Sequence, residues 1–161
     1  MHQPAPDNDW QSDFVMRVVA SFDRATGGDL VREAGLDPNA IGRSAWDGNF
    51  ALLCHSNNAI LTYANRFALA LWEMDWPTML VTPSQQTAPQ GEDRETRAAL
   101  LDEVARNGFI RNYTGRRVSR TGKLFLIENA TVWTLFDEVG HDKKGARFGT
   151  GAFFTSVTRL G

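Results

Sequence analysis

The chain has little cysteine and little histidine: one cysteine, Cys54, and three histidines in 161 residues. A single cysteine excludes a disulfide within the chain and is typical of a reducing compartment, so we expect a cytoplasmic protein. A structural zinc site needs about four such ligands close together, and we therefore predict no metal site.

Long apolar runs and a strong charge of either sign are also lacking. No stretch approaches the roughly 20 apolar residues of a membrane-spanning helix. Residues 1–7 have neither the charged nor the apolar part of a secretion signal. The formal net charge is −2, and the basic residues form no stripe. We therefore expect neither a membrane nor a nucleic acid as a partner.

Aromatic side chains, in contrast, are abundant: the chain has five tryptophans and ten phenylalanines. They fit an aromatic core or an aromatic-lined ligand cavity, and the two are compatible. The length and the 42% share of hydrophobic residues are those of a single globular domain.

The N-terminal third is predicted to be mainly helical. Residues 1–8 are rich in proline and polar side chains and are predicted to be disordered, which leaves one domain at 9–161. Asp9 is predicted to cap a helix, and a second short helical stretch extends this region to residue 34. Residues 35–49 are predicted to be a loop. The helix carries an apolar stripe at spacings of four: Trp10, Phe14, Val18 and Phe22.

The rest of the chain alternates between strand and helix signals. The clearest helix is 92–107, with Gly108 placed to end it. In that helix we expect Ala98, Leu101, Val104 and Ala105 to be buried and Glu95, Arg97, Asp102 and Arg106 to be solvated. The other predicted elements are strands at 50–54 and 59–63 that form a hairpin, a helix at 66–73 capped by Asn65, and strands at 109–119, 124–137 and 147–160.

This order, with a strand that breaks at Tyr63-Ala64-Asn65 into a helix, resembles a PAS domain. More narrowly, the chain resembles the MEKHLA family, a PAS-related module of small bacterial proteins and of plant class III homeodomain-leucine zipper proteins. The motifs that carry the resemblance are His55-Ser56, Tyr63-Ala64-Asn65-Arg66, Asn107-Gly108-Phe109-Ile110, Asn112-Tyr113, Gly115-Arg116-Arg117 and the stretch from Ile127 to Trp133.

The resemblance implies an α+β fold: a PAS-like five-stranded antiparallel sheet with helices on one face and an extra N-terminal helix. It also implies a sensory or ligand-binding role, and it supplies no catalytic residue. Strand alternation puts Phe125, Ile127, Asn129, Thr131, Trp133 and Leu135 on one face of the long strand. We assign that face to the ligand pocket. The N-terminal helix is then expected to cover the opposite face, either in the same chain or across a homodimer.

The predicted ligand-binding residues are Tyr63, Asn65, Trp72, Tyr113, Arg117, Asn129, Thr131 and Trp133. If Tyr113 and Arg117 point inward, the pocket suits a carboxylate or a phosphate, so the expected ligand is a small organic molecule that is anionic or aromatic. Two alternatives remain open. Asn129 could satisfy loop backbone instead, and Arg117 could pair at the surface with Glu128 or a helix carboxylate.

Candidate catalytic residues are His55 and Tyr113. His55 could act as a general base, although such a histidine more often bonds local backbone. Cys54 and His55 alternate along a strand and point to opposite faces, which argues against a Cys–His pair. Haem and flavin are not favoured: His55 is the one histidine placed to bind haem iron, and no Asn-Cys-Arg-Phe-Leu-Gln type motif is present.

Three functions follow from this sequence. The first is a sensory or regulatory domain that binds a small molecule and acts through a dimer or a protein partner. The second is a small enzyme without a cofactor that runs acid–base chemistry, such as isomerisation or cyclisation, in the pocket. The third is a protein–protein interaction module, which predicts a filled pocket.

Overall fold

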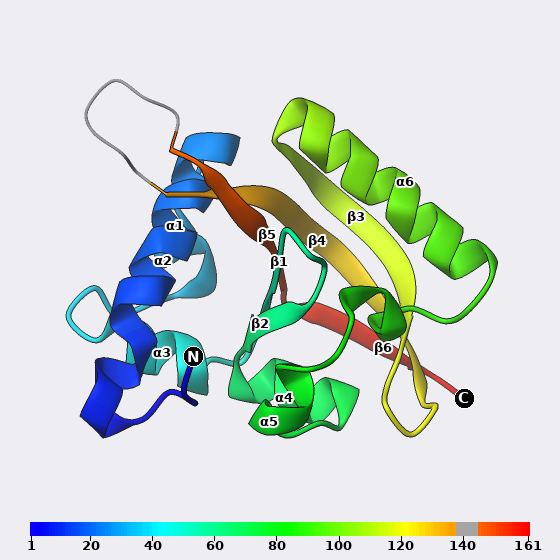
Figure 1. Ribbon diagram of the computed structural model, residues 1–161, viewed down its shortest axis with the longest axis horizontal. Helices are drawn as coiled ribbons and strands as arrows, with labels where there is room; N and C mark the ends of the chain where they lie inside the picture. Colours follow the sequence, from blue (N-terminus) through cyan, green and yellow to red (C-terminus); the bar gives the residue numbers. More distant parts are fainter. Residues whose placement is uncertain (138–144) are drawn as a thin grey trace.

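A computed structural model of the protein describes residues 1–137 and 145–161. Its centre is an antiparallel sheet with the strand order β2-β1-β5-β4-β3, and β6 pairs with β4 beside the end of β5. Figure 1 shows this sheet between α1 and α6. The strands are β1 (Ala51–Ser56), β2 (Leu61–Ala64), β3 (Phe109–Val118), β4 (Leu124–Phe136), β5 (Arg147–Phe154) and β6 (Ser156–Leu160).

The predicted α+β architecture is confirmed. The hairpin, the helix after Asn65 and the long helix before β3 all form where the sequence predicts them, with bounds that differ by at most two residues. One difference concerns the last strand. It is interrupted at Thr155, so that the predicted strand 147–160 becomes β5 and β6, both paired with β4.

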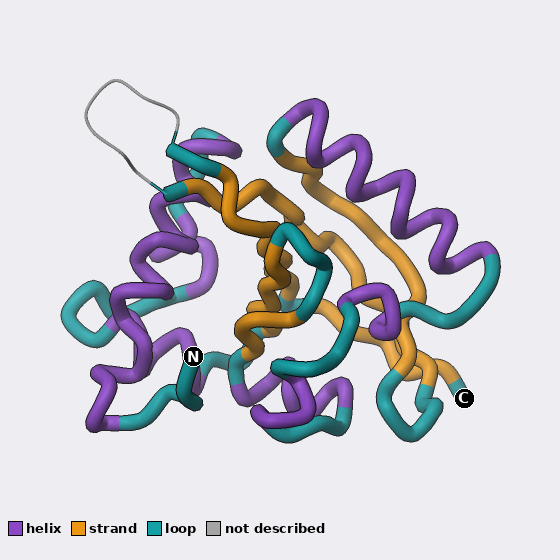
Figure 2. Tube along the Cα trace, in the orientation of Figure 1, coloured by secondary structure: helices purple, strands orange, loops and turns teal. Residues whose placement is uncertain are grey.

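One face of the sheet, here called the inner face, carries the helices that follow β2. These are α4 (Arg66–Trp72), α5 (Trp76–Met79), the 3₁₀ helix η2 (Ser84–Thr87) and α6 (Glu92–Asn107). Helix α4 packs its Trp72 indole against Phe125 of β4, with ring centroids 5.2 Å apart. Helix α6 runs along β3, and Figure 2 shows it at the far side of the sheet from the N-terminal helices.

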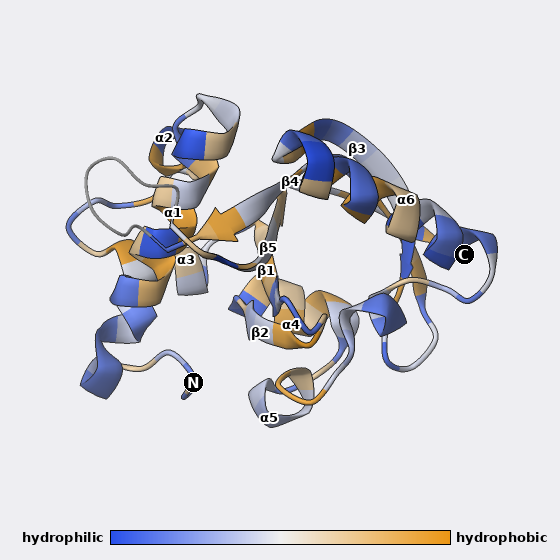
Figure 3. Cartoon of the chain, turned by 45° about the horizontal axis from the view of Figure 1, so that its top comes forward, coloured by the Kyte–Doolittle hydropathy of each residue, from blue (hydrophilic) through white to orange (hydrophobic). Residues whose placement is uncertain are grey.

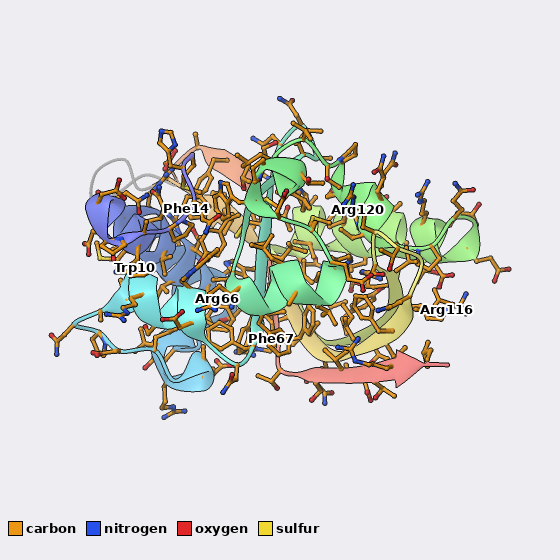
Figure 4. All side chains as sticks on the ribbon, turned by 90° about the horizontal axis from the view of Figure 1, so that it is seen from below. Trp10, Phe14, Arg66, Phe67, Arg116 and Arg120 are labelled. Atoms are coloured by element: carbon orange, nitrogen blue, oxygen red, sulfur yellow. The ribbon has the colours of Figure 1, made fainter. Side chains whose placement is uncertain are left out.

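The opposite, outer face is covered by the N-terminal part of the same chain. Phe22 of α1 meets Trp133 of β4 edge to face at 4.9 Å, and both side chains are buried. The cover is therefore in cis. Figure 4 shows Trp10 and Phe14 at this end of the molecule, and Arg116 at the other. The N-terminal elements are η1 (Pro6–Gln11), α1 (Ser12–Thr26), α2 (Leu30–Ala34) and α3 (Ile41–Asp47).

The N-terminal region differs from its prediction in three ways. Residues 1–8, predicted to be disordered, contact the domain: the Trp76 indole Nε1 donates to the Met1 carbonyl at 3.0 Å. Helix α1 begins at Ser12 instead of Trp10, because residues 9–11 have left-handed backbone with φ of 51° to 57°. The predicted loop 35–49 contains α3, whose Trp46 is buried against Trp76.

Two asparagines interrupt the pairing of β3 with β4. Asn112 and Asn129 have φ of 58° and 54°, and the register shifts beside each of them. Each is an extra residue that forms a β-bulge, and asparagine tolerates this left-handed conformation better than most side chains. A bulge shifts strand alternation by one position. Before Asn129, Phe125 faces inward; after it, Trp133 faces outward, towards α1.

Candidate functional site

A cavity of about 50 Å³ lies between the inner face of the sheet and the helices η2, α4 and α6. Its apolar wall includes Leu53, Leu100, Ile127 and Phe154. The polar side chains of the wall are His55, Ser84, Thr87, Arg97, Arg117 and Thr150.

The cavity separates two apolar clusters. The main core includes Trp72, Ile127 and Phe154, and a small second cluster is built on Leu100, Val104 and Val132. Helix α6 buries Leu100 and Val104 in this small cluster, and Figure 3 shows the helix coloured mainly hydrophilic. Side chains of both clusters line the cavity, so the cavity lies where a continuous core would otherwise be packed.

Two arginines of the cavity wall are buried without a countercharge. Arg97 of α6 is 9% exposed and Arg117 of β3 is 6% exposed. Arg97 Nη2 donates to Ser84 Oγ at 2.8 Å, and Arg117 Nη1 donates to the Arg116 carbonyl at 2.7 Å. Within residues 1–137 and 145–161, neither forms an ion pair with a carboxylate.

Burial and nearby positive charge lower the pKa values of two groups in the cavity wall, Arg97 and His55. Desolvation, and then the nearby Arg117, lower the pKa of Arg97 to about 10. Burial also lowers the pKa of His55, and the charges of Arg97 and Arg147 act in the same direction. His55 Nδ1 lies 3.0 Å from the Ser56 carbonyl, whereas Nε2 is buried without a hydrogen-bond partner among the described residues. His55 is therefore a neutral imidazole near pH 7, with Nδ1 carrying the proton.

Of the predicted ligand-binding residues, Trp72 and Arg117 line the cavity, as does the catalytic candidate His55. Trp72 is fixed by a bond from its indole Nε1 to the Thr87 carbonyl at 3.3 Å. The surface ion pair considered for Arg117 does not form, because the side chain is buried and its guanidinium lies 5.5 Å from the centre of the Tyr113 ring.

The placement of Asn129, Thr131 and Trp133 on the cavity face is wrong. The Asn129 bulge turns the residues after it to the other side, so Trp133 packs on α1 and Thr131 accepts a bond from Arg111 at 3.2 Å. Asn129 itself is exposed. The prediction used uninterrupted alternation along the strand, and the left-handed asparagine breaks it.

Tyr63 and Asn65 are also away from the cavity. Tyr63 is buried on the outer face, where its ring stacks on Phe14 at 5.5 Å, and burial raises the pKa of its phenol. Asn65 is fully buried and its amide is satisfied by backbone. Its Oδ1 accepts from Leu52 N at 3.2 Å and Ala68 N at 3.1 Å, while Nδ2 donates to two carbonyls. Asn65 therefore joins α3, β1 and α4.

Tyr113 lies beside the cavity and is not among its lining residues. Its ring packs against the small cluster under α6, and its hydroxyl is buried without a partner among the described residues. Its face is nevertheless the predicted one. The Asn112 bulge separates Tyr113 and Arg117, which face inward, from Arg111, which lies over the Phe22 ring of α1 and bonds Glu33 of α2.

Four polar residues of the wall were not predicted from the sequence: Arg97, which was expected to be solvated, Ser84, Thr87 and Thr150. The signal for Arg97 was present: Arg97, Leu100 and Val104 follow one another at spacings of three and four, on one side of α6. An arginine in line with buried aliphatic residues marks a position turned to the core. Ser84 and Thr87 come from η2 and Thr150 from β5, and the sequences of these elements hold no comparable signal.

The residues of the wall also bear on which cofactor the cavity could hold. No group of three or more His, Cys, Asp or Glu side chains that could hold a metal occurs in the described ranges. Cys54 is buried on the opposite side of β1 from His55, pairs across the hairpin with Tyr63 and is absent from the cavity wall. The wall therefore does not fit a flavin that reacts with a cysteine. No helix in residues 1–137 and 145–161 has the length and apolarity to cross a bilayer.

The architecture is that of a PAS domain. A PAS domain from Colwellia psychrerythraea matches 78% of this chain and 95% of its own, with a TM-score of 0.58 and 10% identity. The LOV protein of Rhodobacter sphaeroides matches 94% of this chain and 68% of its own, with a TM-score of 0.52 and 16% identity. At these identities the likeness concerns the fold.

Sequence similarity defines the family more narrowly. The family model of the MEKHLA domain matches residues 12–158, and this chain belongs to that family. The homeobox-leucine zipper protein ATHB-9 of Arabidopsis thaliana is 31% identical over 136 residues, which cover 77% of this chain. The match spans 15% of the plant protein's length.

Proposed function

We propose that this chain is a cytoplasmic sensory or regulatory domain that binds a small organic molecule in the cavity under α6. It then acts on a protein partner or on a second copy of itself. The observation that carries the proposal is the cavity between the two apolar clusters, with polar side chains among its lining residues. A purely structural module would gain stability by packing this space.

Helix α6 is the element best placed to transmit ligand binding in the cavity to a protein partner. It is held by the small cluster around Leu100 and Val104, so a ligand beneath it would contact both the sheet and the helix. A change in the position or stability of α6 would be visible to a partner, because most of the helix surface is exposed. A ligand shifts such an equilibrium by its difference in affinity for the two arrangements.

A variant that fills the cavity tests this function. Ala152 of β5 lines the cavity, so Ala152→Leu should occupy the space and abolish small-molecule binding while the protein stays folded. The matched control is Ala105→Leu, the same change on the exposed side of α6. A panel of small organic compounds screened by ligand-observed NMR should contain binders of the wild type and the control that do not bind Ala152→Leu. No binder at all, or equal binding to Ala152→Leu, would contradict the proposal.

The acid–base enzyme remains the second candidate because of one observation. His55 is a neutral imidazole in the cavity wall whose Nε2 has no hydrogen-bond partner among the described residues, which is the form a general base requires. Tyr113, its proposed companion, does not line the wall. If a bound compound is turned over, His55→Gln should abolish turnover and preserve binding; binding without any turnover favours the sensor. The interaction module has less support, because it predicted a filled pocket.

A further inference from the structure

We propose that the cavity ligand is a short-chain carboxylate, held by the guanidinium groups of Arg97 and Arg117. The inference rests on the proposed function, since it names the ligand class of the same cavity. It goes further by deriving that class from two buried charges that no carboxylate of residues 1–137 and 145–161 pairs with.

Burial of a charged group without a partner is costly, and buried arginines are normally paired. Arg97 and Arg117 are each more than nine-tenths buried, and they lie close enough for the charge of one to lower the pKa of the other. Their hydrogen-bond acceptors, the Ser84 hydroxyl and the Arg116 carbonyl, are both neutral. Each guanidinium has five N–H donors, so most remain free for an anion.

Nearby carboxylates in the described residues are engaged elsewhere. Asp93 forms a two-point bond with Arg116, at 3.1 and 2.7 Å, and its interaction with Arg117 is a weaker one through space. Glu73 bonds Lys123 at 2.8 Å at the β3–β4 turn. Neither acid is free to neutralise the two cavity arginines. An anion from outside the chain would do so and would relieve their mutual repulsion.

The shape and the remaining wall limit the anion. A volume of about 50 Å³ has room for roughly three to five water-sized groups, about one third of a cavity that binds benzene. A carboxylate with two or three carbons has this size. Apart from the charged groups, the lining is largely apolar and includes Leu53, Leu100 and Ile127. An alkyl tail suits that wall, whereas phosphate would place oxygen atoms against it.

The carboxylate oxygens match the two arginines. Planar guanidinium groups bind carboxylates with paired, charge-assisted hydrogen bonds, which are stronger than neutral ones. Since the ligand is small, its affinity is limited. At roughly 1.5 kcal/mol per heavy atom, a five-atom ligand binds no tighter than about micromolar. The search for the ligand therefore needs millimolar concentrations.

Calorimetric titration of the full chain with sodium propionate tests the inference, with propionamide as the neutral ligand of the same shape. Propionate should bind and propionamide should not. Arg97→Gln and Arg117→Gln should each weaken propionate binding by about tenfold or more. Arg106→Gln is the matched control on the exposed side of α6 and should leave the affinity unchanged. Thermal melting without ligand checks that both cavity variants remain folded.

The outcomes separate the two proposals. Equal binding of propionamide, or propionate affinity that survives both Arg97→Gln and Arg117→Gln, overturns the carboxylate assignment and leaves small-molecule binding intact. Sodium phosphate binding in the absence of propionate binding also overturns it, in favour of an inorganic anion. If neither propionate nor propionamide binds, the carboxylate assignment fails. If, in addition, no compound of the screening panel binds, the proposed function fails with it.

Discussion

Asn112 of β3 and Asn129 of β4 share the left-handed backbone conformation, with φ of 58° and 54°, in two neighbouring strands. The extra residue on one strand is followed by an extra residue on the other, so the pairing of β3 and β4 recovers its register after both. Together they decide which side chains face the cavity. Arg111 and Trp133 turn towards α1, and Arg117 turns inward.

Replacement of Asn129 by valine should destabilise the protein by about 1–2 kcal/mol. A β-branched residue is strained at positive φ, although valine suits an ordinary strand. Asn129→Gly should cost much less, because glycine adopts this conformation freely. Urea unfolding of both variants measures the difference. Because Asn129 is exposed, the loss would come from the backbone. Equal stability of the valine and glycine variants would mean that the bulge is not required.

Asn65→Ala should cost about 3 kcal/mol or more. The variant leaves buried backbone groups of Leu52, Ala68 and Phe50 without the partners that the Asn65 amide supplies. Asn58→Ala, at the exposed β1–β2 turn, is the control and should change the free energy of unfolding by less than about 0.5 kcal/mol. Chemical denaturation gives both values. A small change in the free energy of unfolding of Asn65→Ala, together with loss of ligand binding, would mean that Asn65 contacts the ligand after all.

Phe22→Ala should destabilise the chain by about 3–5 kcal/mol and leave it monomeric if it remains folded. The side chain is fully buried against Trp133, so its removal opens a hole between α1 and the sheet. Met16→Ala, at a half-exposed site of the same helix, should have little effect. Denaturation curves combined with native mass measure both properties. If α1 instead covers a second copy, stability would rise with protein concentration.

Stability should fall as the pH decreases through about 6.5, and His55 should account for part of the loss. Burial lowers the pKa of folded His55 below its ordinary value of 6.5, so the unfolded chain binds the proton more readily. The contribution is complete above pH 6.5 and is lost below it, at up to about 1.4 kcal/mol per pH unit. Urea unfolding of the wild type and His55→Gln at several pH values should show a flatter profile for the variant. His2→Gln should match the wild type.

The order of elements could be predicted from the sequence because each has a local signal. Gly108 ends α6 as a left-handed cap, and Asn65 caps α4. The helix α3 was missed, because its short sequence Ile41–Asp47 stands between turn residues and is held by tertiary packing of Trp46. Local signals describe elements whose own residues set their conformation, and α3 depends on its neighbours.

The candidate site was predicted only in part, for two physical reasons. A bulge residue with positive φ turns every later side chain of the strand to the other face, and the sequence Glu128-Asn129-Ala130 does not reveal such a residue. Arginine is also normally solvated, so Arg97 was placed at the surface although it lies in line with Leu100 and Val104. Of the predicted residues, His55, Trp72 and Arg117 do line the cavity.

The small apolar cluster beneath α6 also affects the route by which a ligand could enter the cavity. Helix α6 is anchored by Leu100 and Val104 in this small cluster, whereas β4 pairs with β3 and β5 and packs against α1. Its amide protons should therefore exchange with solvent well before those of β4. Local opening of α6 would give a ligand a route into the cavity. The rate of that opening would then limit the rates of ligand association and dissociation.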